Sequence, residues 1–596
     1  MCGIVGYIGQ RKAQPALVNS LKSLEYRGYD SCGIALLGNG NSVEVHKDTL
    51  RVEALERTLS PNSSTIGIGH TRWATHGKPS QLNAHPHVDC SSRVAVVHNG
   101  VIDNFLKLKE QLTQEGHIFK TETDTEVIPH LIEKYYQGNL EQAVSRAIND
   151  ITGSYAFIAI HPDCEQLIVA RNESPLIIGI GDKETLVASD TPAVLDYTDR
   201  VMYLEDGDLA VITQDDIRIT NNGQKVERPE NRIPWTMEEA QKAGHEHFMI
   251  KEIHEQPRVI RNTYKGYVSA VEPVVNLGIK RDDNFNNILL LACGTSYHAA
   301  LIGKHVIHRL AQIPVRVEIA SEFNYSDIML GKTWVMAITQ SGETADSLKA
   351  LRKAKSFGCK TLAITNVVGS SATRIAEEIL YLTAGPEISV AATKSFIAQL
   401  VVLYLLGLAW SSLDVRSRGN MISELRRLPD KVQELLDRES EIASFAKYLA
   451  GQKDMFLVAR GINFPVALEG ALKLKEIAYI HAEGYPAGEL KHGPFALLTP
   501  NTPVIAIAAR DNTYDTLLSN IKEIKARESP VFAIAEDDDS EVEKYVDFVI
   551  KVPKVDPLFS PVVNAVALQL LTYYTAREKG CPIDMPRNLA KSVTVE

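Results

Sequence analysis

The sequence ILLLACG at residues 288–294 is a short, continuously apolar run that ends in glycine and leads into a helical pattern. The same form returns as MFLVARG at residues 455–461. Apolar runs without polar alternation are typical of strands that a parallel sheet buries on both faces. Each run opens a strand–helix–strand–helix–strand pattern, which predicts two α/β domains in tandem. The later strands are expected at 334–339 and 361–365 in the first copy, and at 504–508 and 531–535 in the second.

The part of the chain before about Thr220 follows a different pattern. Short β-type runs alternate with turn residues, and two amphipathic helices are expected at 13–24 and 124–136. This mixture predicts layered sheets with helices rather than a doubly wound sheet. A polar stretch from Thr213 to Asn231 is expected to be a weakly structured connection. Strands are expected at 3–8, 33–37, 66–70, 94–98, 155–160, 167–170 and 186–189.

Composition limits the function classes. The chain has 596 residues, 44% hydrophobic and 23% charged, which is typical of a globular protein with several domains. Its 63 Lys and Arg against 74 Asp and Glu give a net charge of −11, which argues against sequence-independent nucleic-acid binding. No apolar run approaches the roughly 20 residues of a membrane span, and no cationic signal region follows Met1. We expect a cytoplasmic protein that binds neither nucleic acid nor membranes. Its seven cysteines include no C-x-x-C pair, so neither a disulfide scaffold nor a zinc ribbon is predicted.

Cys2 is the first residue with evident chemistry. Removal of Met1 would give it a free α-amine, whose pKa of about 7.7–8 suits it to activate the adjacent thiol. On this residue alone, an inert buried cysteine is the better explanation. Polar segments farther along change that balance: RGYDS at 27–31, HTRWATHG at 70–77, NAHPH at 83–87, HNG at 98–100 and TDTE at 123–126.

In this order the segments resemble the class II glutamine amidotransferases, which are N-terminal-nucleophile hydrolases with an αββα sandwich. The resemblance implies that Cys2 attacks the side-chain amide of glutamine and forms a thioester. The Asn99 amide and the Gly100 N–H would stabilise the oxyanion. The glutamine-binding residues that it implies are Arg27, Arg72, Trp73, Thr75, His76 and Asp124.

Within this set, Arg72 would bind the α-carboxylate of glutamine and Asp124 its α-ammonium group. The loop that begins at Trp73 would close over the substrate. Asp124 is also explained as a carboxylate at a helix N-terminus, and the two roles are compatible. Several histidines suggest a metal, but their spacings fit no common ligand pattern, so neither a metal nor a cofactor is predicted. These are His70, His76, His85, His87 and His98.

In the first α/β domain, hydroxyl residues follow three successive strands, as CGTS at 293–296, TQSGET at 339–344 and NVVGSS at 366–371. Such residues at helix N-termini on one sheet edge form an anion site, although helix capping alone also explains each turn. The runs fit no nucleotide-binding motif. They resemble the SIS, or sugar isomerase, domain family, whose sheets are flavodoxin-like. The phosphosugar-binding residues that this implies are Thr295, Ser296, Gln340, Ser341, Thr344, Val390 and Ala391.

The second α/β domain and the end of the chain carry other reactive side chains. Lys473 and Glu476 share a helix face, His492 lies in a Gly-rich segment, and Lys591 is near the end. Taken alone, Lys473 and Glu476 would be a surface ion pair and Lys591 a mobile lysine at the end of the chain. The whole combination resembles a family of glutamine-dependent enzymes that aminate fructose 6-phosphate to glucosamine 6-phosphate, the first committed step of hexosamine synthesis.

This resemblance implies that Glu476 moves a proton between C1 and C2 and that Lys591 forms a Schiff base with the ketose. Lys473 would assist near the reacting oxygens. His492 would assist ring opening from a neighbouring subunit, so a homodimer is expected. Ammonia would pass between the two active sites through an internal channel, with Trp73, Ala590 and Val593 along it.

The predicted domains are an amidotransferase domain at 1–219, a linker with connecting helices at 220–280, SIS domains at 281–420 and 452–584, and an active-site tail at 585–596. Two other functions stay open. One is a class II amidotransferase with a different acceptor, and the other is a non-catalytic phosphosugar sensor. Regulation by nucleotide sugars and any assembly larger than a dimer are not determined by these residues.

Overall fold

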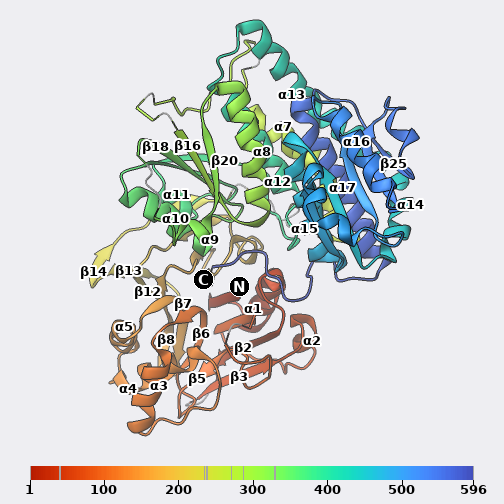
Figure 1. The fold of residues 1–596 in the computed structure, drawn as a ribbon. Helices are drawn as coiled ribbons and strands as arrows, with labels where there is room; N and C mark the ends of the chain where they lie inside the picture. The colour runs from red at the N-terminus through yellow and green to blue at the C-terminus, as the bar shows by residue number, and fades with distance from the viewer. Residues whose placement is uncertain are drawn as a thin grey trace. The chain divides into compact units, whose positions relative to one another are not determined.

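A computed structural model of the chain describes residues 2–38, 42–74, 76–233, 235, 239, 241–269, 271–282, 284–285, 287–327 and 331–594 (Figure 1). The chain forms two compact units. The N-terminal unit comprises Met1–Ala240 together with Ala590–Glu596, and the C-terminal unit comprises Gln241–Leu589. Within the described part, no helix is both long enough and apolar enough to cross a membrane.

The N-terminal unit contains two antiparallel sheets. The first has the order β15 (Glu230–Arg232), β11 (Arg200–Tyr203), β9 (Ile177–Ile180), β10 (Glu184–Ala188), β1 (Gly3–Gly9), β4 (Ile66–Arg72), β2 (Ser31–Leu37), β3 (Val43–Asp48). The second has the order β14 (Gln224–Val226), β13 (Ile217–Asn221), β12 (Asp208–Ile212), β8 (Cys164–Asn172), β7 (Gly153–His161), β6 (Ala95–Ile102), β5 (His87–Val88). The seven strands expected from sequence are all confirmed.

These two sheets pack face to face around one apolar core. Ile4 and Ile68 from the first sheet meet Val97 and Ile158 from the second. Helix α1 (Ala13–Lys22) covers the outer face of the first sheet. Helices α4 (Val127–Tyr135) and α5 (Leu140–Asp150) pack on the outer face of the second. The predicted αββα sandwich is therefore confirmed. The unit also contains α2 (Val52–Glu56), α3 (Phe105–Gln114), η1 (Glu25–Arg27), η2 (Asp124–Glu126) and η3 (Thr191–Ala193).

The expectation of a weakly structured connection between Thr213 and Asn231 is wrong. This stretch forms β13 and β14 and begins β15, at the ends of the two sheets. Edge strands expose one face and one row of backbone groups to water, so their polar sequence resembles that of a loop. The N-terminal unit consequently extends to Ala240, beyond the 219 residues expected for the first domain.

The C-terminal unit contains two parallel sheets of identical topology. The first has the order β17 (Val315–Ile319), β16 (Asn287–Ala292), β18 (Thr333–Ile338), β19 (Lys360–Thr365), β20 (Glu378–Tyr381). The second has the order β22 (His481–Pro486), β21 (Asp454–Ala459), β23 (Val504–Ala508), β24 (Val531–Glu536), β25 (Phe548–Val552). In each sheet the strands follow the order 2-1-3-4-5, which is that of flavodoxin-like folds. The predicted repeat is confirmed.

Two long helices lie in the core shared by these sheets: α12 (Lys394–Ala409) and α17 (Ser560–Glu578). Both are buried on nearly all sides, which explains why their sequences are apolar without a polar face. The other helices are α6 (Phe248–His254), α7 (Gln256–Lys265), α8 (Gly294–Ala311), α9 (Ala320–Phe323), α10 (Ala345–Ser356), α11 (Ser371–Ile375), α13 (Val415–Leu436), α14 (Glu439–Ala450), α15 (Phe464–Ala478) and α16 (Tyr514–Lys525). Short 3-10 helices are η5 (Gly461–Asn463), η6 (Ala487–His492), η7 (Pro494–Leu497), η8 (Val542–Lys544) and η9 (Pro557–Phe559).

Candidate functional site

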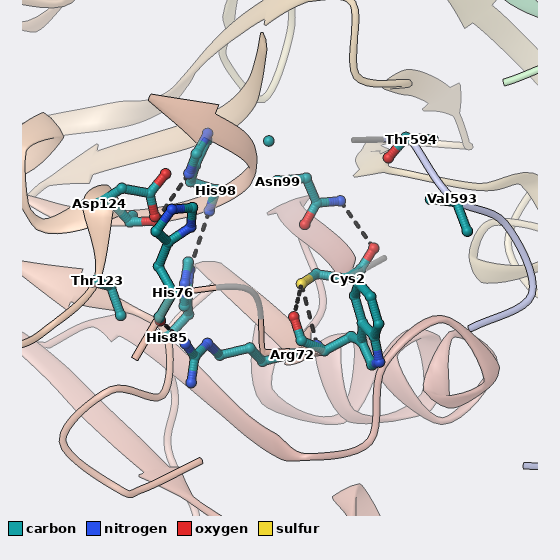
Figure 2. A pocket seen from close by; sticks show the side chains of 13 residues that line it. Cys2, Arg72, His76, His85, His98, Asn99, Thr123, Asp124, Val593 and Thr594 are labelled. Atoms are coloured by element: carbon teal, nitrogen blue, oxygen red, sulfur yellow. Dashed lines mark hydrogen bonds between the residues drawn. The ribbon is translucent and has the colours of Figure 1, made fainter. Parts of the chain in front are cut away.

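Cys2 lies at the start of β1, where the strand pairing brings it beside the end of β4. Gly3 is opposite Thr71 in this pairing, so Cys2 meets the residues that follow the strand. The backbone N–H of Trp73 donates to the Cys2 sulfur at 3.3 Å, and the sulfur lies 3.4 Å from the Trp73 carbonyl oxygen (Figure 2). Burial raises the pKa of the Cys2 thiol, although the nearby cations Arg72 and Arg27 oppose this shift. The thiol therefore needs a base to react at neutral pH.

The predicted oxyanion donors, Asn99 and Gly100, lie on β6 of the opposite sheet. The Asn99 Nδ2 donates to the Cys2 carbonyl oxygen at 2.9 Å (Figure 2). The His70 Nε2 lies 3.0 Å from the His98 carbonyl oxygen and 3.1 Å from the Asn99 Oδ1. Since both partners are acceptors, His70 Nε2 carries a hydrogen and turns the Asn99 NH₂ group toward Cys2. Burial lowers the pKa of His70 to about 3, so its ring stays neutral.

Gly100 follows Asn99 at a position that no other residue fits. Its φ is +130°, and an added Cβ would lie 2.0 Å from the Ser154 carbonyl oxygen. The glycine thus allows β6 to approach β7 closely at the point where its backbone N–H adjoins the pocket. Asn99 and Gly100 both line the pocket that contains Cys2.

We expect replacement of Asn99 by alanine to lower kcat for glutamine hydrolysis by about 10²–10³-fold, with little change in KM. The amide stabilises negative charge that develops in the transition state, so ground-state binding is largely unaffected. Steady-state measurement of glutamate release checks this. Asn172→Ala is the matched control, because the Asn172 amide, on β8 of the same sheet, donates to the Gly153 carbonyl oxygen. An unchanged kcat for Asn99→Ala would remove this residue from the oxyanion site.

Opposite charges line two sides of the Cys2 pocket. Arg72 is buried, and its Nη2 donates to the carbonyl oxygens of His76 and Gly77, the latter at 3.0 Å. Its Nη1 is buried without a hydrogen-bond partner among the described residues, which leaves a cationic donor for an anionic ligand group. Asp124 is also buried, and its Oδ2 accepts the Ile102 N–H at 2.9 Å. Both side chains line the pocket, as a ligand with a carboxylate and an ammonium group requires.

The remaining predicted residues of this site have different positions. Trp73 and His76 line the pocket, whereas Thr75 lies outside the described residues. Arg27 holds the backbone of Cys2 in place, because its Nε donates to the Cys2 carbonyl oxygen at 3.3 Å. The Arg27 guanidinium is itself fixed by an ion pair of 2.5 Å with Asp190. The sequence reasoning missed Asp190, which no nearby motif marks.

The end of the chain contributes to the same pocket. Val593 and Thr594 line it, and Ala590 belongs to the same compact unit. Two of the three predicted channel residues, Trp73 and Val593, are therefore found at the Cys2 pocket. Lys591 also belongs to the N-terminal unit, so its predicted role at the sugar site stays a prediction.

Several histidines in and beside the wall of the pocket pack against one another, and burial keeps their rings neutral. His70 and His85 stack with ring centres 4.0 Å apart, and His85 meets His87 edge-on at 4.5 Å. Burial lowers the pKa of His85, His87 and His98. These rings fill the space beside the nucleophile and fix its neighbours by hydrogen bonds, such as that of 2.9 Å between the His98 Nδ1 and the Thr125 Oγ1.

In the C-terminal unit, the predicted phosphosugar residues follow the carboxyl ends of β16 and β18, which are neighbouring parallel strands. Thr295 and Ser296 begin α8, and Thr344 is the residue before α10. The Ser341 Oγ accepts the Glu343 N–H at 3.1 Å, so the loop that follows Gln340 turns tightly at this edge. The sheet thus brings the predicted hydroxyl groups to one edge, as an anion site requires. Val390 and Ala391 are buried in the segment between β20 and α12.

A buried charge cluster on α15 lies next to this edge. Glu469, Lys473 and Glu476 share one helix face, with the Lys473 Nζ 3.4 Å from Glu469 and 2.5 Å from Glu476. Glu469 also accepts from Thr295 at 3.0 Å and lies 2.7 Å from the His298 Nδ1, and both of these partners are on α8. The interpretation of Lys473 and Glu476 as a surface pair is therefore wrong. The sequence reasoning missed Glu469, although its i, i+4 spacing from Lys473 could have indicated it.

Burial alone would lower the pKa of Lys473, but the Glu476 and Glu469 carboxylates raise it above its usual value. Removing this cation takes the ion-pair partner from the partly exposed Glu476 and leaves the buried Glu469 with Thr295 and His298 only. We expect Lys473→Met to lower the free energy of opening α15 by about 3–5 kcal/mol. Native-state hydrogen exchange of the α15 amides in the full chain measures this. Lys475→Met, at an exposed position of the same helix, is the control. Equal protection of the α15 amides against exchange in both variants would contradict the prediction.

His492 lies at the end of η6 and is exposed on the C-terminal unit. An exposed position is compatible with a role at a neighbouring subunit, which stays a prediction.

Comparison with known proteins identifies the domains. A family model described as SIS domain matches residues 284–409 and 448–578, and one described as glutamine amidotransferase domain matches residues 70–196. The solved C-terminal domain of glucosamine-fructose-6-phosphate aminotransferase from Francisella tularensis is similar with a TM-score of 0.55 and 36% identity. That similarity covers 58% of this chain and 99% of the solved chain.

Full-length relatives are also similar. Proteins named glutamine–fructose-6-phosphate aminotransferase (isomerizing) from Caldanaerobacter subterraneus subsp. tengcongensis and Thermococcus kodakarensis are 49% and 48% identical. One of that name from Thermus thermophilus is 45% identical. In each case the similarity covers 100% of this chain and 100% of the relative. With its sandwich, its tandem SIS domains and its Cys2 pocket, the chain belongs to the family of glutamine–fructose-6-phosphate aminotransferases (isomerizing).

Proposed function

We propose that this protein converts D-fructose 6-phosphate and L-glutamine to D-glucosamine 6-phosphate and L-glutamate. The observation that carries the proposal is the Cys2 pocket. A nucleophile, an oriented amide donor from Asn99, the Arg72 Nη1, which has no partner among the described residues, and the carboxylate of Asp124 all line it. Together these groups match the side-chain amide, α-carboxylate and α-ammonium of glutamine.

In the glutaminase reaction, the Cys2 α-amine that Met1 removal exposes takes the thiol proton, since burial disfavours a free thiolate. The sulfur attacks the amide carbon, and the Asn99 Nδ2 and Gly100 N–H stabilise the oxyanion. The Cys2 α-ammonium gives the proton to the NH₂ group of the tetrahedral intermediate, the C–N bond breaks, ammonia leaves and a γ-glutamyl thioester remains. Water then cleaves the thioester to release glutamate.

In the sugar reaction, the Lys591 amine condenses with the C2 ketone of fructose 6-phosphate and releases water. Ammonia displaces Lys591 from this imine. Glu476 removes a proton from C1 and returns it to C2, while the C1 hydroxyl loses its proton and the imine nitrogen gains one, which converts the ketose imine to the 2-amino aldose. His492 of a neighbouring subunit assists ring opening, so the active protein is a homodimer. Support comes from the hydroxyl-bearing edge of the first SIS sheet and from the hydrogen bond of Thr295 to the Glu469 carboxylate on α15.

Ammonia travels inside the protein, because in bulk water it would be protonated and lose its nucleophilicity. Trp73 and Val593 at the Cys2 pocket are proposed to begin this route, with Ala590 farther along it. We also propose a cytoplasmic location.

The test is an assay of both products with purified protein whose Met1 removal is confirmed by mass. With glutamine and fructose 6-phosphate together, glutamate and glucosamine 6-phosphate should form in equal amounts. Glutamate without amino sugar would indicate an amidotransferase with another acceptor. Sugar-phosphate binding without either product would indicate a non-catalytic sensor.

A further inference from the structure

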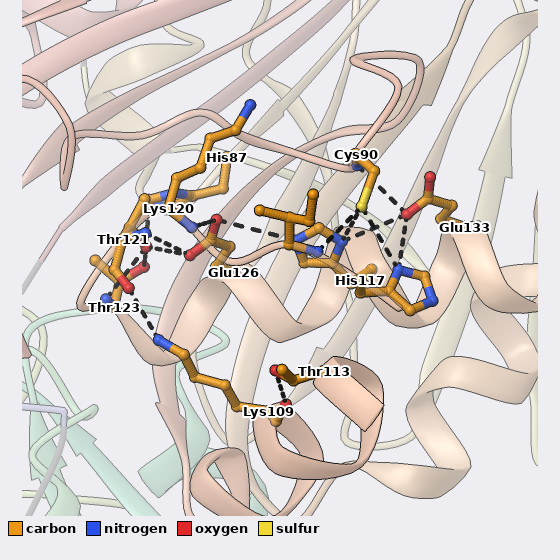
Figure 3. A network of polar contacts seen from close by, with 12 residues as sticks. His87, Cys90, Lys109, Thr113, His117, Lys120, Thr121, Thr123, Glu126 and Glu133 are labelled. Carbon is orange, nitrogen blue, oxygen red and sulfur yellow. Dashed lines mark hydrogen bonds and ion pairs between the residues drawn. The ribbon is translucent and has the colours of Figure 1, made fainter. Parts of the chain in front are cut away.

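A second cluster of reactive side chains lies in the N-terminal unit, among residues that the proposed reaction does not use. Cys90 comes from the loop between β5 and β6, and His117 follows α3 (Figure 3). His130 and Glu133 lie on adjacent turns of α4. One sulfur, nitrogen or oxygen atom of each residue lies within 4.8 Å of the others.

The four candidate ligand atoms of this cluster lie close enough to one another to surround a single ion. The Cys90 Sγ lies 3.6 Å from the His130 Nδ1 and 3.8 Å from the His117 Nδ1. The Glu133 Oε2 lies 2.9 Å from the His117 Nδ1 and 3.4 Å from the His130 Nδ1. Around a tetrahedral zinc ion, with bonds of about 2.3 Å to sulfur and 2.0–2.2 Å to nitrogen or oxygen, neighbouring ligands are about 3.3–3.6 Å apart.

We propose that Cys90, His117, His130 and Glu133 bind a zinc ion. One thiolate, two imidazoles and one carboxylate are the ligand types that zinc prefers, and four protein ligands make a closed, structural site. Both histidines direct the same ring nitrogen, Nδ1, toward the sulfur and the carboxylate (Figure 3).

Hydrogen bonds alone explain this arrangement less well. The Glu133 Oε2 would have to serve both imidazoles and also accept the Cys90 backbone N–H at 3.3 Å. The Cys90 sulfur would face two ring nitrogens at once. A cation between the four atoms gives each of them the same favourable partner.

Groups around the four candidate ligands contact the Cys90 sulfur and the His130 ring. The backbone N–H of Ile118 donates to the Cys90 sulfur at 3.4 Å, which stabilises a thiolate. The other nitrogen of His130, Nε2, is buried and makes no hydrogen bond within the described part of the chain, and the Glu126 Oε1 lies 3.9 Å from it, at the distance of a charge contact. A carboxylate behind a ligating histidine orients the ring and increases its basicity.

Through Glu126 the cluster connects to the segment that carries Asp124. The Glu126 carboxylate accepts the backbone N–H groups of Lys120 at 2.8 Å and Thr121 at 2.7 Å. The Thr121 hydroxyl lies 2.9 Å from that of Thr123, which lines the Cys2 pocket. The zinc ion therefore holds α4 to the two loops before it and stabilises the wall of the pocket.

The first experiment is elemental analysis of the full chain, grown with zinc and dialysed against metal-free buffer. One zinc per chain is expected, and Cys90→Ser and Glu133→Gln should each weaken zinc binding by more than about 100-fold. Cys164→Ser is the matched control, because Cys164 is a partly buried cysteine of the same unit outside the cluster. The proposal would be overturned if the unchanged chain held no more zinc than Cys90→Ser. It would also be overturned if Cys164→Ser lost as much zinc as Cys90→Ser.

A second experiment replaces zinc by Co²⁺ in the unchanged chain, so it does not depend on the folding of a variant. The unchanged chain loaded with Co²⁺ should show the intense visible absorption of a tetrahedral site and a sulfur-to-cobalt charge-transfer band. An octahedral spectrum without the charge-transfer band would overturn the proposal. Zinc should also raise the thermal midpoint of the unchanged chain and leave that of Cys90→Ser unchanged. These readouts use neither glutamine nor sugar, so they are independent of the proposed reaction.

Discussion

Replacing Cys2 by alanine should lower glutamine-dependent synthesis of glucosamine 6-phosphate by a factor on the order of 10⁴ or more. The sulfur is the only atom of the pocket proposed to form a bond to the substrate, and alanine leaves no nucleophile at that position. Asn99 and Arg72 would remain in place and still bind glutamine. The measurement is release of glutamate and amino sugar under saturating substrates, with binding of glutamine followed separately by calorimetry.

Ammonium provides the internal control for this variant. If only the glutaminase reaction is lost, added ammonium salts should restore glucosamine 6-phosphate formation without any glutamate. The matched variant Cys164→Ala removes a sulfur of the same unit that lies outside the pocket and should retain full activity. Glutamate release by Cys2→Ala near the unchanged rate would refute the assignment of the nucleophile.

Replacing Glu476 by glutamine should lower glucosamine 6-phosphate formation by about 10²–10⁴-fold while glutamine hydrolysis continues. An amide is nearly the same shape as a carboxylate but cannot take a proton from C1 at neutral pH. Lys473 loses one carboxylate partner in this variant and keeps Glu469 at 3.4 Å, so α15 should remain folded. The ratio of glutamate to amino sugar, which is one in the coupled reaction, measures the effect directly.

The same helix supplies the control for this prediction. Lys475→Gln changes an exposed residue one position away and should leave the product ratio at one. Solvent exchange gives a second readout, because loss of the proton-transfer group should also abolish incorporation of deuterium at C1 or C2 of the sugar. Synthesis by Glu476→Gln at the unchanged rate would exclude Glu476 as the proton carrier.

Much of the fold follows from local patterns. The run at 288–294 and its repeat at 455–461 predict buried parallel strands, and both are central strands of five-stranded sheets. Pattern analysis missed the strands at the edges of the four sheets, which are β3, β5, β14, β15, β17, β20, β22 and β25, and it also missed the interior strands β9, β11, β12 and β13. An edge strand buries only part of its surface, so its residues carry a weaker apolar signal than those of a central strand.

For the site residues, sequence motifs predict the identity of the residues well and their arrangement in space poorly. Arg72 and Asp124 were both expected at the glutamine site, and both line the Cys2 pocket. The orientation of the Asn99 amide by His70 and the support of Arg27 by Asp190 became visible only in the structure. These contacts join residues that no short motif contains, because they depend on how the strands are paired.

Residue types and their spacing along the chain determined the domain order, the central strands and the reactive residues within each motif, since these depend on contacts between near neighbours. Tertiary structure decided how separate segments combine. The burial of Lys473 between two carboxylates and the meeting of Cys90, His117, His130 and Glu133 are such cases. The physical reason is that burial and ligand geometry depend on the packing of strands and helices distant in sequence, so no linear pattern records them.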